Sequence, residues 1–494
     1  MVAPSARTGR RRLWLAMILL VYGTLASAYA LRTPAWQVPD EPAHYNYVRY
    51  IAEARQLPEL RPGDYPGAYL EEIKSARFAP SYSIEPIRYE SHQPPLYYVL
   101  ATPVFLAARA AGVAVPLLPL RLFSVSLGAV TLLLTYALMR SLYPQDDQLA
   151  LGAVACMALV PMQLAITGAV NNDGLVMLLL TLLVWQLVVI DSAWSWGRAA
   201  LLGLLVGLAL LTKLQAYIAA PLVFLSWAWS LYRARRRRDR LAPLLGQGAL
   251  AAAVAALLVA PWLARNAQVY GPGDLLAMVR HEQVTSGQLA TSALLAEHGL
   301  PATLRMLLET TFHSFWGQFG WMALPLPRRV YALLGAAVLL AALGLLDRAI
   351  TARGKPRPQS VYRALLLGCW AAFTTAGFGW YNLQVVQHQG RYLFPALPVW
   401  SLLLVSGWLQ LYQRGPRWIV ALAGLGAAAL LAIGVIRQDV PSLGIALLLG
   451  GAALVLLGNR LERRWPGVPL LGTLLALALL AEWCLSSLLP ALAP

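Results

Sequence analysis

The chain has 494 residues, of which 59% are hydrophobic and only 12% are charged. A soluble domain carries about 25% charged residues, so this composition excludes an ordinary soluble protein and indicates an integral membrane protein. The formal net charge of +17 does not indicate nucleic-acid binding, because each dense basic run lies beside an apolar run, which is typical of cytoplasmic anchors under the positive-inside rule. These runs are Arg10–Arg12, Arg233–Arg240, Arg348–Arg357 and Arg460–Arg464.

Apolar runs of about 20 residues, the length that crosses a bilayer core of about 30 Å, recur along the chain and predict about thirteen transmembrane helices. The predicted fold class is therefore an all-α polytopic membrane protein. The predicted spans are 13–31, 118–139, 148–169, 173–191, 198–212, 215–232, 243–263, 329–347, 361–379, 391–412, 416–436, 441–458 and 467–488.

The basic runs fix the predicted orientation. With Arg10–Arg12 in the cytoplasm, the large first loop 32–93 and the loop 264–324 are extracytoplasmic. The first apolar segment also resembles a signal peptide, but it is long for one, and a retained first helix is the preferred interpretation. Keeping Arg233–Arg240 inside leaves no crossing for the apolar stretch 94–111, which we predict to be re-entrant or surface-lying.

The first loop concentrates polar residues that could carry chemistry. It holds nine of the 22 acidic residues and two of the six histidines, and it opens with the motif Pro-Asp-Glu-Pro-Ala-His at 39–44. Asp40 and Glu41 lie at the membrane boundary, where partial desolvation can tune a carboxylate for general-base work. His44 shares a helix face with Asp40 if a helix starts at Pro42. The alternatives are a solvated loop start or a helix cap for the acids and a structural role for His44.

Three more residues of interest are predicted at the same membrane face. His92 closes the first loop before Pro94, and Asp173 begins a predicted helix, where it is either functional or a simple cap. Lys213 is the only lysine in an apolar segment. A buried ammonium needs a partner or must snorkel to the surface, and a lipid-linked phosphate would be a suitable partner.

Arg265 and Arg391 lie at predicted outer helix ends, where the positive-inside rule disfavours arginine. Each therefore calls for an anionic partner, which is either a phosphate gripped bidentately or a carboxylate of the acidic loop. His313 lies in the segment 311–321, which interleaves aromatic and polar residues and predicts an interfacial belt or a sugar-stacking wall.

The combined motifs resemble the GT-C glycosyltransferase superfamily, which includes protein O-mannosyltransferases, aminoarabinose transferases and the oligosaccharyltransferase catalytic subunit. The matching elements are the acidic pair of the first loop, the His-x-Pro-Pro-Leu-Tyr-Tyr start of the next helix and the Asn-Asp after the third span. With Phe-Trp-Gly at 315–317 and Gly-Arg-Tyr at 390–392, they look most like a bacterial branch of membrane proteins of unknown function. These motifs cover about residues 35–400.

The resemblance implies an inverting transfer of a sugar from a polyprenyl-phosphate donor to a lipid, glycan or protein acceptor in the cell envelope. It implies Asp40 as general base with Glu41 beside it, and substrate-binding roles for the other residues. These are His44, His92, Asp173, Lys213, Arg265, His313 and Arg391. Some relatives use a divalent metal cation near the acids, and the metal ligands of this chain are left unassigned.

The resemblance also implies a multi-pass protein of the bacterial inner membrane, with its N-terminus in the cytoplasm and its site outside. We expect residues 1–412 to form the catalytic module and 413–494 to form scaffold helices. The competing hypothesis is a transporter or flippase of lipid-linked sugars. Broken helices at mid-membrane depth would favour it, whereas ionisable groups confined to one face oppose it.

Overall fold

The computed structural model describes residues 4–191, 193–352 and 358–494. In these residues nearly all regular structure is helical, and the one sheet is a hairpin of β1 (Gln318–Phe319) and β2 (Leu324–Pro325) with Gln318 opposite Pro325. The predicted all-α polytopic fold is confirmed.

The helices of the first half build the loop region and five of the candidate spans. They are α1 (Pro4–Arg32), α2 (Glu41–Ala54), α3 (Gly67–Ser75), η1 (Tyr89–His92), α4 (Leu96–Ala110), α5 (Leu117–Leu142), α6 (Asp147–Ala158), α7 (Pro161–Thr167), α8 (Asp173–Ile190), α9 (Trp196–Leu210), η2 (Leu214–Ile218) and α10 (Ala219–Arg237).

The second half begins with a long helix and ends at the C-terminus. Its helices are α11 (Ala242–Tyr270), α12 (Met278–Val284), α13 (Thr291–Trp316), α14 (Arg328–Thr351), α15 (Pro358–Gln384), η3 (Gly390–Ala396), α16 (Leu397–Arg414), α17 (Arg417–Arg437), α18 (Ser442–Arg464), α19 (Val468–Trp483), η4 (Cys484–Leu488) and η5 (Leu489–Leu492).

Within the described residues, eleven helices are long and apolar enough to cross a membrane, and α6 with α7, bent by 64°, makes twelve. The difference from the thirteen predicted spans lies at 198–212. This segment folds as α9, which has 15 residues and is only about 22 Å long at 1.5 Å per residue. It is therefore shorter than a bilayer core of about 30 Å.

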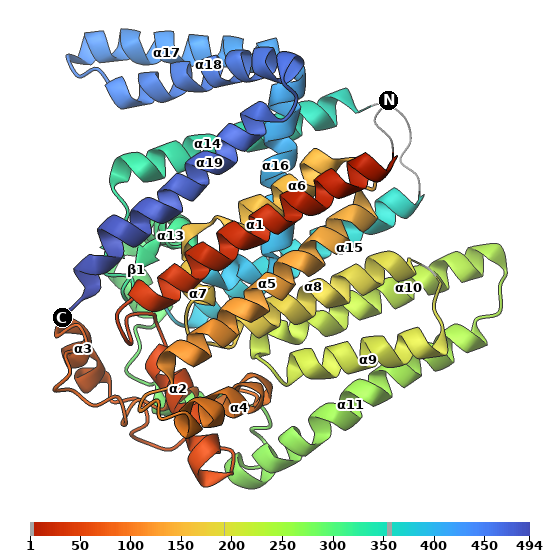
Figure 1. The fold of residues 1–494 in the computed structure, drawn as a ribbon, viewed down its shortest axis with the longest axis vertical. Helices are drawn as coiled ribbons and strands as arrows, with labels where there is room; N and C mark the ends of the chain where they lie inside the picture. Colours follow the sequence, from red (N-terminus) through yellow and green to blue (C-terminus); the bar gives the residue numbers. More distant parts are fainter. Residues whose placement is uncertain (1–3, 192, 353–357) are drawn as a thin grey trace.

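Figure 1 shows most of the long helices side by side, with α2, α3 and α4 gathered at the end of the bundle where the C-terminus lies and the start of α1 at the other end. We call the first the site end and the second the basic end. At the site end Arg77 donates to the carbonyl of Ala493 at 3.0 Å, and at the basic end Arg11 pairs with Asp147 at 2.7 Å. Residues 353–357 of one predicted basic run, including Lys355, lie outside the described residues.

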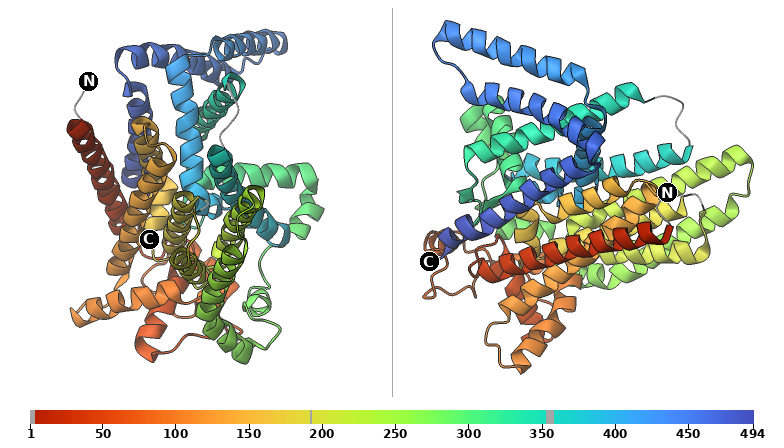
Figure 2. Two further views of the ribbon diagram at one scale, coloured as in Figure 1. Left: turned by 90° about the vertical axis from the view of Figure 1, so that its right-hand side faces the viewer. Right: turned by 45° about the horizontal axis from the view of Figure 1, so that its top comes forward.

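The stretch predicted as re-entrant or surface-lying forms α4, whose 15 residues are too few for a span. The helix packs against α2 and α5, and the left view of Figure 2 shows it lying crosswise to the long helices at the site end. The N–H of Leu96 donates to the carbonyl of Leu211 at 2.9 Å, which ties the start of α4 to the end of α9. This arrangement agrees with the surface-lying alternative.

The C-terminal helices divide into two groups. The hairpin of α17 and α18 lies at the edge of the molecule (Figures 1 and 2), whereas α19 packs back against α6 and α7. Tyr29 of α1 donates to the carbonyl of Ala481 at 2.8 Å, so α19 also supports the helix that leads into the first loop. The division into a module of residues 1–412 and a scaffold of 413–494 stays a prediction.

Candidate functional site

The first loop presents its acidic pair through an unusual backbone conformation. Asp40 precedes the first turn of α2 in the left-handed region, with φ 69° and ψ −7°. Aspartate tolerates this region better than most residues, and Pro42 in the first turn suits the helix start. Because of this turn, the two neighbouring carboxylates reach different partners.

Glu41 is fully buried and is held by Arg121 of α5. Arg121 donates to the two carboxylate oxygens at 2.8 and 2.6 Å, which makes a bidentate ion pair. The N–H groups of Trp36 and Val170 donate to the same carboxylate at 3.2 and 3.1 Å. Arg121 also donates to backbone carbonyls at the end of α1. The contacts of Glu41 are those of an anchor that fixes the first loop to α5.

Asp40 keeps 22% of its side chain exposed and lies between two donors. Arg391 of η3 forms an ion pair with Oδ2, and the hydroxyl of Tyr89 donates to Oδ1 at 2.7 Å. Burial pushes the pKa of Asp40 up, but the Arg391 charge and the hydrogen bonds from Arg391 and Tyr89 outweigh it and lower the pKa to about 2. In this arrangement Asp40 is an ionised but weakly basic carboxylate.

A second ion pair lies beside the first. Lys213 donates to Oδ1 of Asp173 at 2.5 Å, and both side chains are 12% exposed. The ring of Tyr392 joins the two pairs, because the Lys213 Nζ lies 6.0 Å and the Arg391 guanidinium 5.3 Å from its centroid. The structure thus brings together Asp40, Asp173, Lys213 and Arg391 from four separate stretches of the chain. Their role in binding a substrate stays a prediction.

His44 lies next to this cluster and is neutral. Burial lowers its pKa, against the raising effect of Glu90 and Asp40. Its Nδ1 lies 2.8 Å from the hydroxyl of Tyr98, which also accepts from Asn172 at 3.4 Å. A tyrosine hydroxyl can donate one hydrogen bond and accept two, so either His44 Nδ1 or Tyr98 can be the donor in this contact.

His92 contacts a histidine that the sequence did not single out. Its ring centroid lies 4.1 Å from that of His281 on α12. Burial lowers the pKa of His92 to about 4 and that of His281 to about 3, so both rings are neutral at pH 7. This pair closes the cluster on the side of α12.

Two predicted substrate-binding residues have structural contacts. Arg265 donates to the carbonyl of Pro58 at 2.6 Å and stacks over Trp262, so it ties the first loop to α11. His313 stacks on Tyr331 with ring centroids 3.7 Å apart. The anion expected for Arg265 is thus replaced by backbone oxygens. Substrate roles for both residues remain untested predictions.

The aromatic segment around His313 serves the packing of the first loop. Trp316 and Phe319 are buried, and Trp321 stacks on Phe78 and donates to the carbonyl of Trp36 at 2.9 Å. These contacts differ from both a lipid-facing belt and an open sugar-stacking wall.

Sequence reasoning missed Arg121, Tyr89 and Glu90. Arg121 could have been found, because it lies near the start of an apolar helix and an arginine there needs an anionic partner. The same argument was applied to Arg265 and Arg391. Tyr89 and Glu90 lie in a loop without periodicity, and only the tertiary fold brings them to Asp40. Burial and the charge of Asp40 raise the pKa of Glu90, although His44 and Lys213 oppose this.

The acidic residues do not form a metal site in the part of the chain that the structure describes. No group of three or more histidine, cysteine or acidic side chains is placed to hold an ion there. Asp40, Glu41 and Asp173 each pair with a cationic side chain instead. These residues therefore do not fit the divalent cation that the resemblance allows.

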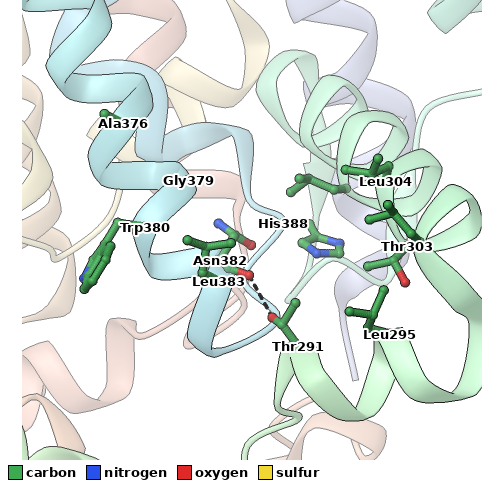
Figure 3. A pocket seen from close by; sticks show the side chains of 12 residues that line it. Thr291, Leu295, Thr303, Leu304, Ala376, Gly379, Trp380, Asn382, Leu383 and His388 are labelled. Atoms are coloured by element: carbon green, nitrogen blue, oxygen red, sulfur yellow. Dashed lines mark hydrogen bonds between the residues drawn. The ribbon is translucent and has the colours of Figure 1, made fainter.

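A largely apolar groove of about 450 Å³ runs between α13 and α15 and ends at His388 (Figure 3). Figure 3 shows Leu295 and Leu304 on one wall, Trp380 and Leu383 on the other and His388 between the two helices. His388 precedes Arg391 by three residues. Tyr381, which lies between the lining residues Trp380 and Asn382 in sequence, contacts the ring of Tyr392, with centroids 6.0 Å apart. The groove thus ends at a residue that is close to Arg391 in sequence.

The arrangement of the helices is shared with a solved membrane protein. The structure is similar to that of ArnT from Cupriavidus metallidurans bound to undecaprenyl phosphate, with a TM-score of 0.50 and 16% sequence identity over 97% of this chain and 77% of that chain. The oligosaccharyltransferase of Archaeoglobus fulgidus in the apo form matches with a TM-score of 0.48 and 14% identity, over 89% of this chain and 56% of that chain. The predicted GT-C resemblance is thus confirmed for the fold.

Residues 81–400 match the family model described as "Predicted membrane protein (DUF2142)". The chain therefore belongs to this family, which agrees with the predicted branch of membrane proteins. No curated protein matches the sequence.

Proposed function

We propose that this chain is a membrane glycosyltransferase that moves a sugar, with inversion, from a polyprenyl-phosphate donor to an acceptor in the cell envelope. One observation carries the proposal: a groove with apolar walls ends at His388, three residues before Arg391, and both Arg391 and Lys213 are cations held by carboxylates in one cluster. A polyprenyl phosphate has the matching chemistry, a long apolar tail with an anionic head. The likeness in fold to ArnT, whose structure holds undecaprenyl phosphate, supports it.

The tail and the head of the donor would occupy different parts of the site. Exposing the tail to water costs about 0.8 kcal/mol per CH₂ group, so it lies in the groove while the phosphate stays at the membrane boundary. Arg391 offers a planar fork that can grip phosphate oxygens, and Lys213 offers a point charge. Both cations already have carboxylate partners, so the phosphate competes with Asp40 and Asp173 for them.

This competition gives Asp40 its role as general base. When the phosphate takes Arg391, the interaction that most lowers the pKa of Asp40 weakens, and the carboxylate becomes more basic. Asp40 then accepts the proton of the acceptor hydroxyl while the new glycosidic bond forms and the polyprenyl phosphate leaves. We assign Glu41 to holding Asp40 in position, because its oxygens are occupied by Arg121 and two backbone N–H groups.

The basic end of the bundle would face the cytoplasm under the positive-inside rule. The site end, with Asp40, would then face outward from a bacterial inner membrane. The parity of the predicted spans puts all six histidines on this outward side. The acceptor remains defined only by its class, a hydroxyl-bearing lipid, glycan or protein.

A flippase of lipid-linked sugars is the second candidate, and the bend between α6 and α7 is the observation that favours it. The break itself consists of Leu159 and Val160, which are apolar and buried. The break itself therefore contributes no ionisable side chain that could receive a phosphate. The clustering of charged pairs at the site end therefore favours the transferase.

Filling the groove tests the tail-binding part of the proposal. Gly379 lines the groove, and a Cβ built there meets no atom within 4 Å, so Gly379→Phe places a ring in the groove without a clash at the backbone. Displacing about two CH₂ groups of the tail should weaken undecaprenyl phosphate binding about tenfold. Titration of the purified protein in nanodiscs measures this.

Gly368→Phe is the matched control, since Gly368 lies on the same helix with equal space but outside the groove. We expect it to bind like the unmodified protein. Equal affinity of Gly379→Phe and Gly368→Phe for undecaprenyl phosphate would show that the tail does not use this groove.

A further inference from the structure

The buried cluster contains one carboxyl group that no cation neutralises among the described residues. Asp40, Glu41 and Asp173 pair with Arg391, Arg121 and Lys213. The side chain of Glu90 is buried, and its Oε2 has no hydrogen-bond partner in the same residues. An unpartnered buried carboxyl oxygen is unusual enough to require a physical explanation.

Two amide side-chain oxygens of the same cluster are likewise buried without a hydrogen-bond partner in the described part of the chain. Gln93 Oε1 and Asn172 Oδ1 are buried and lack partners among the described residues. Glu90 and Gln93 lie on the same turn, where Gln93 N–H donates to the Glu90 carbonyl at 3.0 Å. Glu90 acts electrostatically on His44, and His44 connects through Tyr98 to Asn172. These links connect the three residues to the same group of side chains around His44 and Tyr98.

The hydrogen bonds of each amide nitrogen fix which atom is the free one. His92 donates from Nδ1 to the carbonyl of Tyr89, so its Nε2 is an acceptor and the group 3.3 Å away must be the Gln93 NH₂. Asn172 donates from Nδ2 to the carbonyl of Thr212 at 3.3 Å. In both residues the amide oxygen is therefore the atom without a hydrogen-bond partner among the described residues. The region thus offers three oxygen acceptors, and the buried Nε of Arg391 adds one unpartnered donor.

We propose that Glu90, Gln93 and Asn172 form the subsite that holds the sugar of the donor, by accepting hydrogen bonds from its hydroxyl groups. This proposal rests on the proposed function. A sugar supplies several O–H donors together with oxygens that can accept from Arg391 Nε, which matches the free atoms of the cluster. Arg391 would then contact the phosphate through its terminal nitrogens and the sugar through Nε. Glu90 is a specificity residue in this assignment, and proton transfer stays with Asp40.

The test separates the sugar from the lipid phosphate. Affinity is measured in nanodiscs for undecaprenyl phosphate alone and for undecaprenyl phosphate carrying glucose, mannose or galactose. The readout is the ratio between the Kd of the bare lipid and the Kd of the best sugar-bearing lipid. We expect a ratio of about ten or more in the unmodified protein, since hydrogen bonds to a charged group contribute about 1.5–3 kcal/mol each.

Glu90→Gln and Gln93→Leu should each lower this ratio about three- to tenfold and leave the Kd of the bare lipid within about twofold. Unchanged affinity for the bare lipid also shows that the variants are folded. Glu85→Gln is the control, because Glu85 is an exposed acid of the same loop that pairs with Arg49.

The possible failures have different meanings. If the unmodified protein does not bind undecaprenyl phosphate, the proposed function is wrong, and the sugar-subsite proposal is wrong as well because it depends on that function. If the bare lipid binds but no sugar raises the affinity, or if Glu90→Gln and Gln93→Leu leave the ratio unchanged, only the sugar subsite is wrong. An equal loss for bare and sugar-bearing lipids would place Glu90 at the phosphate and would also overturn the assignment.

Discussion

Replacing Asp40 by Asn is expected to reduce sugar transfer by about 10²- to 10⁴-fold, the range that general-base catalysis contributes. The amide keeps the shape of the side chain and can still accept from Tyr89, but it cannot take up the proton of the acceptor. The change also removes the carboxylate that competes for Arg391. Binding of undecaprenyl phosphate should therefore be retained or strengthened while transfer is lost.

This opposite response of binding and transfer distinguishes a catalytic base from a structural residue. Asp64→Asn provides the control, since it makes the same chemical change in the same loop at a residue that accepts from the Arg61 N–H. We expect it to transfer sugar at the normal rate. An Asp40→Asn protein that is folded and fully active would refute the assigned base.

Replacing Arg121 by Met is expected to destabilise the protein by about 3–5 kcal/mol, because it leaves the buried carboxylate of Glu41 without its cation. The stability of a folded protein is only about 5–15 kcal/mol. A large fraction of the Arg121→Met molecules should therefore fail to accumulate in folded form. The carbonyls at the end of α1 lose their donor as well. The unfolding temperature and the monodisperse fraction after purification measure the effect.

The double variant Glu41→Gln with Arg121→Met removes both charges and should regain part of the lost stability. Its recovery would show that the stranded charge, and not the loss of arginine packing alone, causes the damage. An Arg121→Met protein with the unfolding temperature of the unmodified chain would show that the Glu41–Arg121 pair does not anchor the loop.

The helices were predictable because lipid imposes a simple rule. A segment of about 20 apolar residues has few alternatives to a spanning helix, and the predicted spans are helical apart from end residues and the break between α6 and α7. The rule is weakest for short segments, and the disagreement lies at α9, which stops before Lys213. The parity of the basic runs excluded a crossing for α4 but left both the re-entrant and the surface-lying position open.

The partners of the site residues could be predicted only in part. An isolated cation or anion in an apolar chain must find a counter-charge, which correctly drew attention to Lys213 and Arg391. Which carboxylate each would meet depends on the tertiary fold, because Asp40 and Arg391 are 351 residues apart in sequence. The same reasoning gave Arg265 a ligand-binding role that its contacts with backbone carbonyls do not require.

The acidic pair shows how neighbours in sequence can separate in function. Asp40 and Glu41 share a motif, so sequence alone treated them together as catalytic. The left-handed turn at Asp40 sends one carboxylate toward Arg391 and the other toward Arg121. Backbone dihedral angles of this kind leave little trace in local sequence, since aspartate is common in many turns.

The most direct test of the account is a proteoliposome assay with undecaprenyl phosphate carrying a radiolabelled sugar, in the presence of a cell-envelope extract as acceptor. A glycosyltransferase moves the label to the acceptor and releases bare undecaprenyl phosphate, and both products should disappear with Asp40→Asn. If the labelled lipid instead crosses between leaflets without losing its sugar, and Asp40→Asn leaves this movement unchanged, the chain is a flippase and the proposed transfer is wrong.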